Sequence, residues 1–186
     1  MELASALRIQ ARANRLANHR LHRAMAALPA SDWLAPRVGF FPSLAATLNH
    51  ILAVDGYYIG ALWRDDGLVQ RYKDFVACAT LAELEDRQRA SDERLIAFCD
   101  GLRGDAACDA WVDMDRGEHV QRDRVGHVLA HLFMHQTHHR GQAHAMLSAT
   151  SVAPPQLDEF LMPSDAPLRV ADMAALGWSE GQAFPS

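Results

Sequence analysis

Apolar residues recur at intervals of three and four positions in four long segments of the chain, which is the spacing that lines one face of an α-helix. Pro29 ends the first segment, because proline cannot continue a helix. Ser43 and Thr80 stand at the start of the second and third segments, where their hydroxyl groups can accept hydrogen bonds from a first helical turn. The pattern therefore predicts four helices, at about residues 3–28, 43–64, 80–101 and 119–148.

The rest of the chain is short or interrupted by helix breakers. Apolar and polar residues alternate over residues 111–117, which predicts a short extended segment or a small hairpin. Beyond Thr150, repeated prolines exclude another long helix and leave short turns, at about residues 157–161 and 171–176, packed over the helices. Four long helices predict an all-α fold, a four-helix bundle that forms one domain over residues 1–186.

Composition and charge narrow the classes of function. Hydrophobic residues make up 49% of the 186 residues, which is enough to fill a single core. The formal net charge is −5, and the 18 basic residues are interspersed among 23 acidic ones, so the chain lacks a basic footprint for nucleic acid. No apolar stretch approaches the roughly 20 residues that cross a membrane. We therefore expect neither a nucleic acid nor a membrane as the partner.

The cysteines and the N-terminal segment indicate the compartment. Cys78, Cys99 and Cys108 are odd in number and lack CxxC spacing, which fits reduced thiols in the core or on the surface. Arginines interrupt the first 28 residues, where a signal peptide would need an apolar segment. The sequence therefore predicts a cytoplasmic protein.

Residues 131–142, HLFMHQTHHRGQ, hold four of the ten histidines inside the last predicted helix. Histidines four residues apart lie one helical turn apart, so their imidazoles can converge on one cation. On a helical wheel with His131 at 0°, His135 falls at about 40° and His139 at about 80°, within or bordering the apolar stripe. His131 and His138 lie at or below about 0° on the same wheel. His135 and His139 are therefore the pair expected to face the interior.

A metal site needs a ligand from a facing helix, because two histidines of one helix rarely complete it. His50 lies on the flank of the apolar stripe of the second predicted helix and is the preferred third ligand. The alternative is that the inward histidines are core residues, satisfied by hydrogen bonds to carboxylates or carbonyls without a metal. The other histidines are expected on polar faces or at the surface: His19, His22, His119, His127 and His144.

Three neutral imidazoles would leave some coordination positions of a divalent cation open to substrate. They suit zinc, nickel, iron and copper alike, so the sequence does not fix the metal. Asp55 lies on the other flank of the helix that carries His50. It either orients a neighbouring side chain or is a partly solvated aspartate near a helix end. No residue stands out as a general base, and no glycine loop for phosphate is present in the sequence.

Three motifs resemble the DinB/YfiT-like family of metalloproteins, which is distinct from the DNA polymerase that shares the DinB name. They are NHILAVD at residues 49–55, the histidine run at residues 131–142 and PQLDEFL at residues 155–161. They occur in the family's order and spacing over most of the chain. The resemblance implies a four-helix bundle, commonly a homodimer, that holds one divalent metal by three histidines matching His50, His135 and His139.

The resemblance also bears on three other residues of the histidine run. Gln142 shares the buried side of the helix and is a candidate hydrogen-bond partner for a ligand histidine. Arg140 matches the family motif and is expected to tie helix ends together. Gly141 is expected to permit close helix packing.

Characterised members of this family include transferases and isomerases that use low-molecular-weight thiols. The resemblance therefore implies a metal-dependent enzyme acting on a small-molecule substrate, with a small thiol as co-substrate and Zn, Ni or Fe as the metal. Hydrolysis by an activated water fits the same site. Two alternatives stay open: a non-catalytic, stress-related protein that binds a metal or an organic ligand, and a helical interaction module without a metal.

Overall fold

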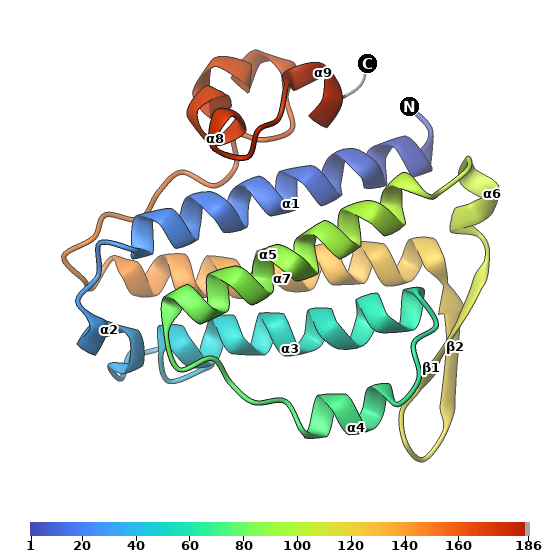
Figure 1. The fold of residues 1–186 in the computed structure, drawn as a ribbon, viewed down its shortest axis with the longest axis horizontal. Helices are drawn as coiled ribbons and strands as arrows, with labels where there is room; N and C mark the ends of the chain where they lie inside the picture. Colours follow the sequence, from blue (N-terminus) through green and yellow to red (C-terminus); the bar gives the residue numbers. More distant parts are fainter. Residues whose placement is uncertain (185–186) are drawn as a thin grey trace.

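The computed structural model describes residues 1–184 and is mostly helical (Figure 1). Four long helices lie side by side: α1 (Leu3–Met25), α3 (Leu44–Leu62), α5 (Leu81–Asp100) and α7 (Val125–Leu147). Shorter elements connect and cover them: α2 (Ala30–Leu34), α4 (Leu68–Lys73), α6 (Asp105–Cys108), β1 (Trp111–Asp115), β2 (Val120–Arg124), the 3-10 helix η1 (Pro163–Arg169), α8 (Val170–Ala175) and α9 (Glu180–Ala183). The predicted helical class is therefore confirmed.

The starts of α3 and α5 are set by side-chain caps, as predicted. The Ala46 N–H donates to Ser43 Oγ at 3.1 Å, and the Glu83 N–H donates to Thr80 Oγ1 at 3.2 Å. Each cap satisfies an N–H group that the first turn of a helix leaves without an intrahelical partner. The two helices that carry much of the buried polar chemistry therefore begin at fixed residues.

The four long helices do not simply alternate in direction along the chain. In Figure 1, α1 and α7 run in one direction and α3 and α5 in the other. Since α3 and α5 are parallel neighbours, the chain must return along their full length between them. Residues 63–80, which include α4, form this return segment along the outside of α3.

The last long helix is shorter than predicted, because residues 120–124 form a strand. The prediction placed its start near residue 119, whereas α7 begins at Val125 and β2 pairs antiparallel with β1 before it. Helical periodicity cannot reveal this strand, since β2 is held by its partner rather than by its own apolar pattern. Val112 and Met114 of β1 are buried and anchor the hairpin to the core, which confirms the alternative of a small hairpin.

Apolar side chains fill the two ends of the space between the long helices. One cluster joins the first part of α1 to the last part of α3 and the first part of α7, with Leu7, Leu62 and Leu129 among its members. The other joins the last part of α1 to the first part of α3 and the last part of α7, with Leu21, Leu48 and Leu147. Burial of such side chains is the main force that holds the helices together.

A layer of polar side chains lies between these two apolar clusters. Its members, called the polar layer below, are all buried and come from all four long helices: Asn14, Asn18, Asp55, Gln88, Asp92, Gln136 and Arg140. Gln88 Nε2 donates to Asp55 Oδ2 at 2.8 Å and to Asp92 Oδ1 at 3.1 Å, so one amide bridges two carboxylates. Buried polar groups of this kind are tolerated only when hydrogen-bonded.

Arg140 supplies positive charge to the polar layer through two amides. Its Nη1 donates to Asn14 Oδ1 at 2.7 Å and to Asn18 Oδ1 at 2.9 Å. Asn18 Nδ2 donates in turn to both oxygens of Asp92, at 3.0 and 3.1 Å. Burial lowers the pKa of Arg140 to about 10 and raises the pKa of Asp92 to about 6. The arginine therefore keeps its charge at neutral pH and stabilises the ionised aspartate.

The C-terminal segment covers the outer face of α1. Phe160, Met173 and Ala183 form a third apolar cluster with Leu16 and other α1 residues. Arg20 of α1 fixes the segment, since its side chain pairs with the carboxylates of Asp172 and Glu159. The expectation of short turns packed over the helices is therefore confirmed.

Replacing Arg140 with methionine should lower the free energy of unfolding by about 3–5 kcal/mol, because it removes one of the two buried cations near Asp92, leaving Arg15, and deprives two amide oxygens of their donor. Urea denaturation followed by circular dichroism measures this loss. The matched control is Arg94→Met, which removes a partly exposed ion pair with Asp65 and should cost less than about 1 kcal/mol. Equal losses for the two variants would show that the polar layer does not depend on Arg140.

Asp55→Asn should change how stability depends on pH. Burial raises the pKa of Asp55 from 3.8 to about 7, so the folded state retains a proton that the unfolded chain releases near pH 4. Stability contributed by the protonated group is therefore lost as pH rises from about 4 to about 7. Over this pH range, the free energy of unfolding of the wild-type protein should fall by up to about 4 kcal/mol relative to that of Asp55→Asn. This follows because a tenfold change in proton affinity corresponds to about 1.4 kcal/mol.

Urea denaturation of the two metal-free proteins at half-unit steps of pH gives this difference directly. Comparing the two proteins cancels the titration of the histidines, which they share. A difference that stays constant with pH would contradict a raised pKa for Asp55.

Candidate metal centre

Three histidines from two facing helices come together in the structure. His50 of α3 and His135 and His139 of α7 each offer one ligand atom, and these atoms all lie within 4.8 Å of one another. His50 Nε2 and His135 Nε2 are 3.0 Å apart. These are the three residues that the sequence singled out, and the arrangement could hold a metal ion. They are called the histidine cluster below.

Gln142 fixes the orientation of His139. The His139 Nδ1–H donates to Gln142 Oε1 at 2.8 Å, and Gln142 Nε2 donates to His138 Nε2 at 3.1 Å. With its Nδ1 used in this way, His139 leaves Nε2 with a free lone pair. A hydrogen bond from the second ring nitrogen is the usual support of a histidine ligand. The predicted partnership between Gln142 and a histidine of the cluster is therefore present.

The other two imidazoles are held neutral by their surroundings. Burial, together with the neighbouring His139 and His50, lowers the pKa of His135 to about 4. Burial and His139 also lower the pKa of His50. The buried His135 Nδ1 has no hydrogen-bond partner among the described residues. Neutral rings with converging lone pairs are the form in which histidine binds a cation.

An aromatic side chain covers one side of the histidine cluster. The Phe41 ring centroid lies 4.5 Å from that of His50 and 5.5 Å from that of His139. Phe41 belongs to the segment just before α3, which lies outside the four predicted helices. Its position shields the cluster from water and strengthens electrostatic interactions inside it.

The other side borders a pocket of about 460 Å³ between α3, α4, α7 and the hairpin. His135 and His131 of α7 form part of its wall, together with Tyr58 of α3. The volume lies in the range of small-molecule sites. The histidine cluster is therefore covered by Phe41 and adjoins a space that a small molecule can enter.

Asp55 connects the histidine cluster to the polar layer. Gln136, which follows His135 in the sequence, donates through Nε2 to Asp55 Oδ1 at 2.8 Å. Because Asp55 is completely buried, the alternative of a partly solvated aspartate is wrong. Asp55 instead fixes α7 against α3, five residues along α3 from His50 and through the residue next to His135.

The remaining histidines lie mostly where the sequence predicted. His131 and His138 are exposed at the edge of the cluster, and His119 and His127 are exposed elsewhere. His22 is a correction, because it is buried and desolvation lowers its pKa to about 3. The wheel argument failed for it because α1 is covered by α5 and α7 on one side and by the C-terminal segment on the other.

Gly141 is also a correction. It is exposed, and a Cβ atom placed on it would meet no atom within 4 Å. It therefore does not permit close helix packing. Arg140 does connect α7 to α1, through its bonds to Asn14 and Asn18, but it does so in the interior of the helices and not at their ends.

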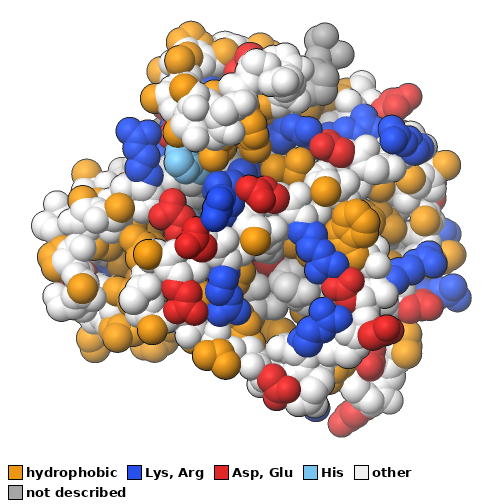
Figure 2. All heavy atoms as spheres, viewed as in Figure 1, with side chains coloured by type: hydrophobic (Ala, Val, Ile, Leu, Met, Phe, Trp, Pro, Cys, Tyr) orange, Lys and Arg blue, Asp and Glu red, His pale blue; other side chains and the backbone are white. Residues whose placement is uncertain are grey.

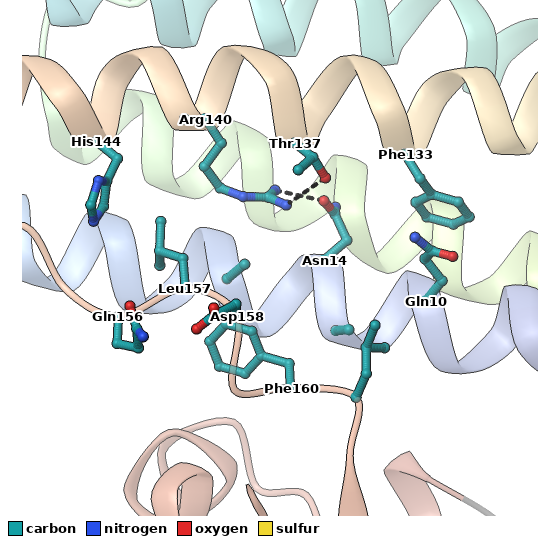
Figure 3. A pocket seen from close by; sticks show the side chains of 14 residues that line it. Gln10, Asn14, Phe133, Thr137, Arg140, His144, Gln156, Leu157, Asp158 and Phe160 are labelled. Carbon is teal, nitrogen blue, oxygen red and sulfur yellow. Dashed lines mark hydrogen bonds between the residues drawn. The ribbon is translucent and has the colours of Figure 1, made fainter.

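A second pocket, of about 480 Å³, lies on the opposite face of α7, against α1 and residues 156–161. Figure 3 shows Arg140 extending from α7 toward Asn14 of α1, beside Thr137. Although Arg140 follows His139 in the sequence, its guanidinium points away from the histidine cluster. The two pockets therefore lie on different sides of the helix, and only the one beside His135 adjoins the cluster.

Sequence reasoning missed several residues at the site. Phe41 and Tyr58 were not singled out, because nothing in the local pattern shows which aromatic residue faces a histidine. Gln136 was also missed, although a glutamine next to His135 inside the apolar stripe gave a signal.

Charged side chains of both signs are visible on the face drawn in Figure 2. Acidic and basic side chains are interspersed on that face. Within residues 1–184, no helix combines the length and the apolar character that crossing a bilayer requires.

Comparison with known proteins agrees with the motifs. The model of the DinB family matches residues 8–169, a range that contains the whole histidine cluster. No match was found among curated proteins. Because the family model covers most of the sequence, the chain belongs to the DinB family.

Proposed function

We propose that the protein binds one divalent transition metal through His50, His135 and His139 and is a metal-dependent enzyme for a small-molecule substrate. The observation that carries this proposal is the convergence of three ligand atoms within 4.8 Å of one another, from the buried His139 and the partly buried His50 and His135. Without a cation, the Nε2 atoms of His50 and His135 lie against each other at 3.0 Å. A shared cation satisfies the converging nitrogens better.

The chain's own residues give this site the properties of a reaction centre. A divalent cation held by neutral imidazoles would lower the pKa of a bound thiol or water and so supply a nucleophile. Phe41 excludes water from one side, Gln142 orients His139, and Gln136 with Asp55 fixes α7 against α3. The pocket beside His135 gives a substrate access. This open pocket favours catalysis over a purely stabilising metal.

We propose small-thiol S-transfer or hydrolysis as the reaction class, with Zn, Ni or Fe as the metal. The thiol rests on the resemblance to the DinB/YfiT-like family. The same resemblance leads us to propose a single four-helix-bundle domain that forms a homodimer. The three cysteines are all unpaired and buried, which supports our proposal of a cytoplasmic location.

The wild-type protein should bind about one equivalent of a divalent transition metal, and His50→Ala or the double variant His135→Ala/His139→Ala should abolish stoichiometric uptake. Equilibrium dialysis followed by elemental analysis measures the metal content. His131→Ala and His138→Ala are matched controls from the same helix and should retain full uptake. Full metal content in the double variant would defeat the proposed metal site.

The catalytic part of the proposal is tested on the same proteins. The metal-loaded wild type is screened with small thiols and electrophiles, and with hydrolysable esters, beside the double variant. Turnover by the wild type alone supports an enzyme, whereas a metal-loaded protein inactive throughout these reaction classes contradicts one.

Gln142→Ala should weaken metal binding by about 10–100-fold, because it removes the hydrogen bond that orients His139. A competition titration with a chelator of known affinity measures the change. Gln156→Ala, at an exposed glutamine far along the chain, is the control and should bind metal as tightly as the wild type. An unchanged affinity in Gln142→Ala would mean that His139 is oriented by packing alone.

A further inference from the structure

The pocket beside the histidine cluster is lined by basic side chains and by no acidic ones. Its lining combines tyrosines and valines with two cationic side chains and contains no aspartate or glutamate: Val54, Tyr57, Tyr58, Val69, Tyr72, Lys73, Arg116, His131 and His135. This is unexpected in a chain whose acidic residues outnumber its basic ones by 23 to 18. An interior of this kind attracts an anion.

Arg116 has no ion-pair partner among the described residues. Its Nε donates to Gln121 Oε1 at 3.0 Å and its Nη2 to the Tyr58 hydroxyl at 3.2 Å, both uncharged acceptors. Arg122, on the same hairpin, pairs instead with Asp113 at 3.0 Å. Lys73 at the end of α4 is likewise without a carboxylate partner in residues 1–184, whereas nearby Arg71 pairs with Asp65. The pocket's cations are therefore left for a ligand.

The guanidinium of Arg116 is held in place by aromatic rings. Its Cζ lies 5.0 Å from the ring centroid of Tyr57 and 5.4 Å from that of Tyr58. The Tyr57 hydroxyl donates to the Asp115 carbonyl, which fixes the end of β1 just before Arg116. A planar fork stacked in this way is pre-organised to bind a carboxylate, so little rotamer entropy is lost when an anion arrives.

The same tyrosines form flat apolar walls. The Tyr57 ring packs edge-on against Tyr58 and Tyr72, with centroids 5.4 and 6.0 Å apart. Together with two valines, these rings leave a space suited to a planar carbon skeleton, since aromatic groups favour edge-to-face and offset contacts with other rings. The pocket therefore combines a carboxylate-binding fork with surfaces for a flat body.

A short series of rings leads from this fork to the histidine cluster. The Tyr58 ring lies 5.1 Å from His131, whose ring lies 6.3 Å from that of His135. A ligand with its anionic group on Arg116 would thus extend along Tyr58 and His131 toward His135. The end of the ligand opposite its carboxylate would then face the histidine cluster.

We propose that this pocket binds a small planar carboxylate, aromatic or conjugated, with its carboxylate on Arg116 and Lys73 and its body among the tyrosines. Its role as the substrate rests on the proposed function of the histidine cluster. Binding of the anion itself does not, because neither Arg116 nor Lys73 belongs to the cluster. The two proposals can therefore fail separately.

The test compares benzoate with benzamide, two planar molecules of the same size that differ in charge, by isothermal titration calorimetry on metal-free wild-type protein. Benzoate should bind at least tenfold more tightly than benzamide. Arg116→Gln and Lys73→Gln should each weaken benzoate binding several-fold, and the two together should abolish it. Arg122→Gln, which removes a paired arginine from the same hairpin, is the control and should leave the affinity unchanged.

Metal uptake by Arg116→Gln and Lys73→Gln should equal that of the wild type, which separates this proposal from the metal site. Lys73→Gln keeps the test valid if loss of Arg116 perturbs the hairpin, since Lys73 is exposed on α4. Equal affinity for benzoate and benzamide would overturn the proposal. So would benzoate binding that neither substitution weakens.

Discussion

The structure depends on two carboxylates buried at the middle of four helices. Asp55 and Asp92 are almost fully removed from water, and an isolated carboxylate in that position would destabilise the fold by several kcal/mol. They persist because amides from the other long helices donate to them and because Arg140 lies behind those amides. Every long helix must therefore be in register for the carboxylates to be satisfied. The apolar clusters hold the helices together, and the polar layer determines how they align.

That alignment is what makes the histidine cluster possible. His50 and His135 are on different helices, and a shift of one helical turn would separate their nitrogens by about 5.4 Å. Asp55 opposes such a shift, because it lies five residues from His50 on α3 and accepts a hydrogen bond from Gln136, the residue next to His135 on α7. The hydrogen bonds of the polar layer thus place the histidines, and Gln142 orients one of them. The geometry of the histidine cluster therefore depends on hydrogen bonds that also stabilise the fold.

Much of this could be predicted from the sequence, for reasons that particular residues show. The long helices follow from apolar spacing and from Ser43 and Thr80, whose capping is a local property. His135 and His139 were identifiable because two histidines one turn apart inside an apolar stripe share a face. His50 was placed on the flank of its own stripe, and the family resemblance indicated the same residue. Arrangements within one helix are therefore the ones that sequence reasoning recovers best.

The rest depends on which elements become neighbours. The polar layer left a partial signal, since Asn14 with Asn18, Gln88 with Asp92 and Gln136 with Arg140 are each one helical turn apart. The sequence does not show which of these pairs hydrogen-bond to one another, because their contacts depend on the parallel placement of α3 and α5. The strand β2 was missed for the same reason, as its hydrogen bonds are made with β1.

The position of Arg140 late in the chain has a consequence for synthesis on the ribosome. The nascent polypeptide contains Asp55 and Asp92 long before Arg140 has been added. Until then, α1, α3 and α5 can supply Arg15 beside Asp92, but Asn14 and Asn18 lack the donor that Arg140 gives them, and Asp55 lacks Gln136. The hydrogen bonds of the buried carboxylates are therefore completed only when the last long helix is present. Because that helix also carries His135 and His139, one late stretch of the polypeptide finishes both the interior polar contacts and the histidine cluster.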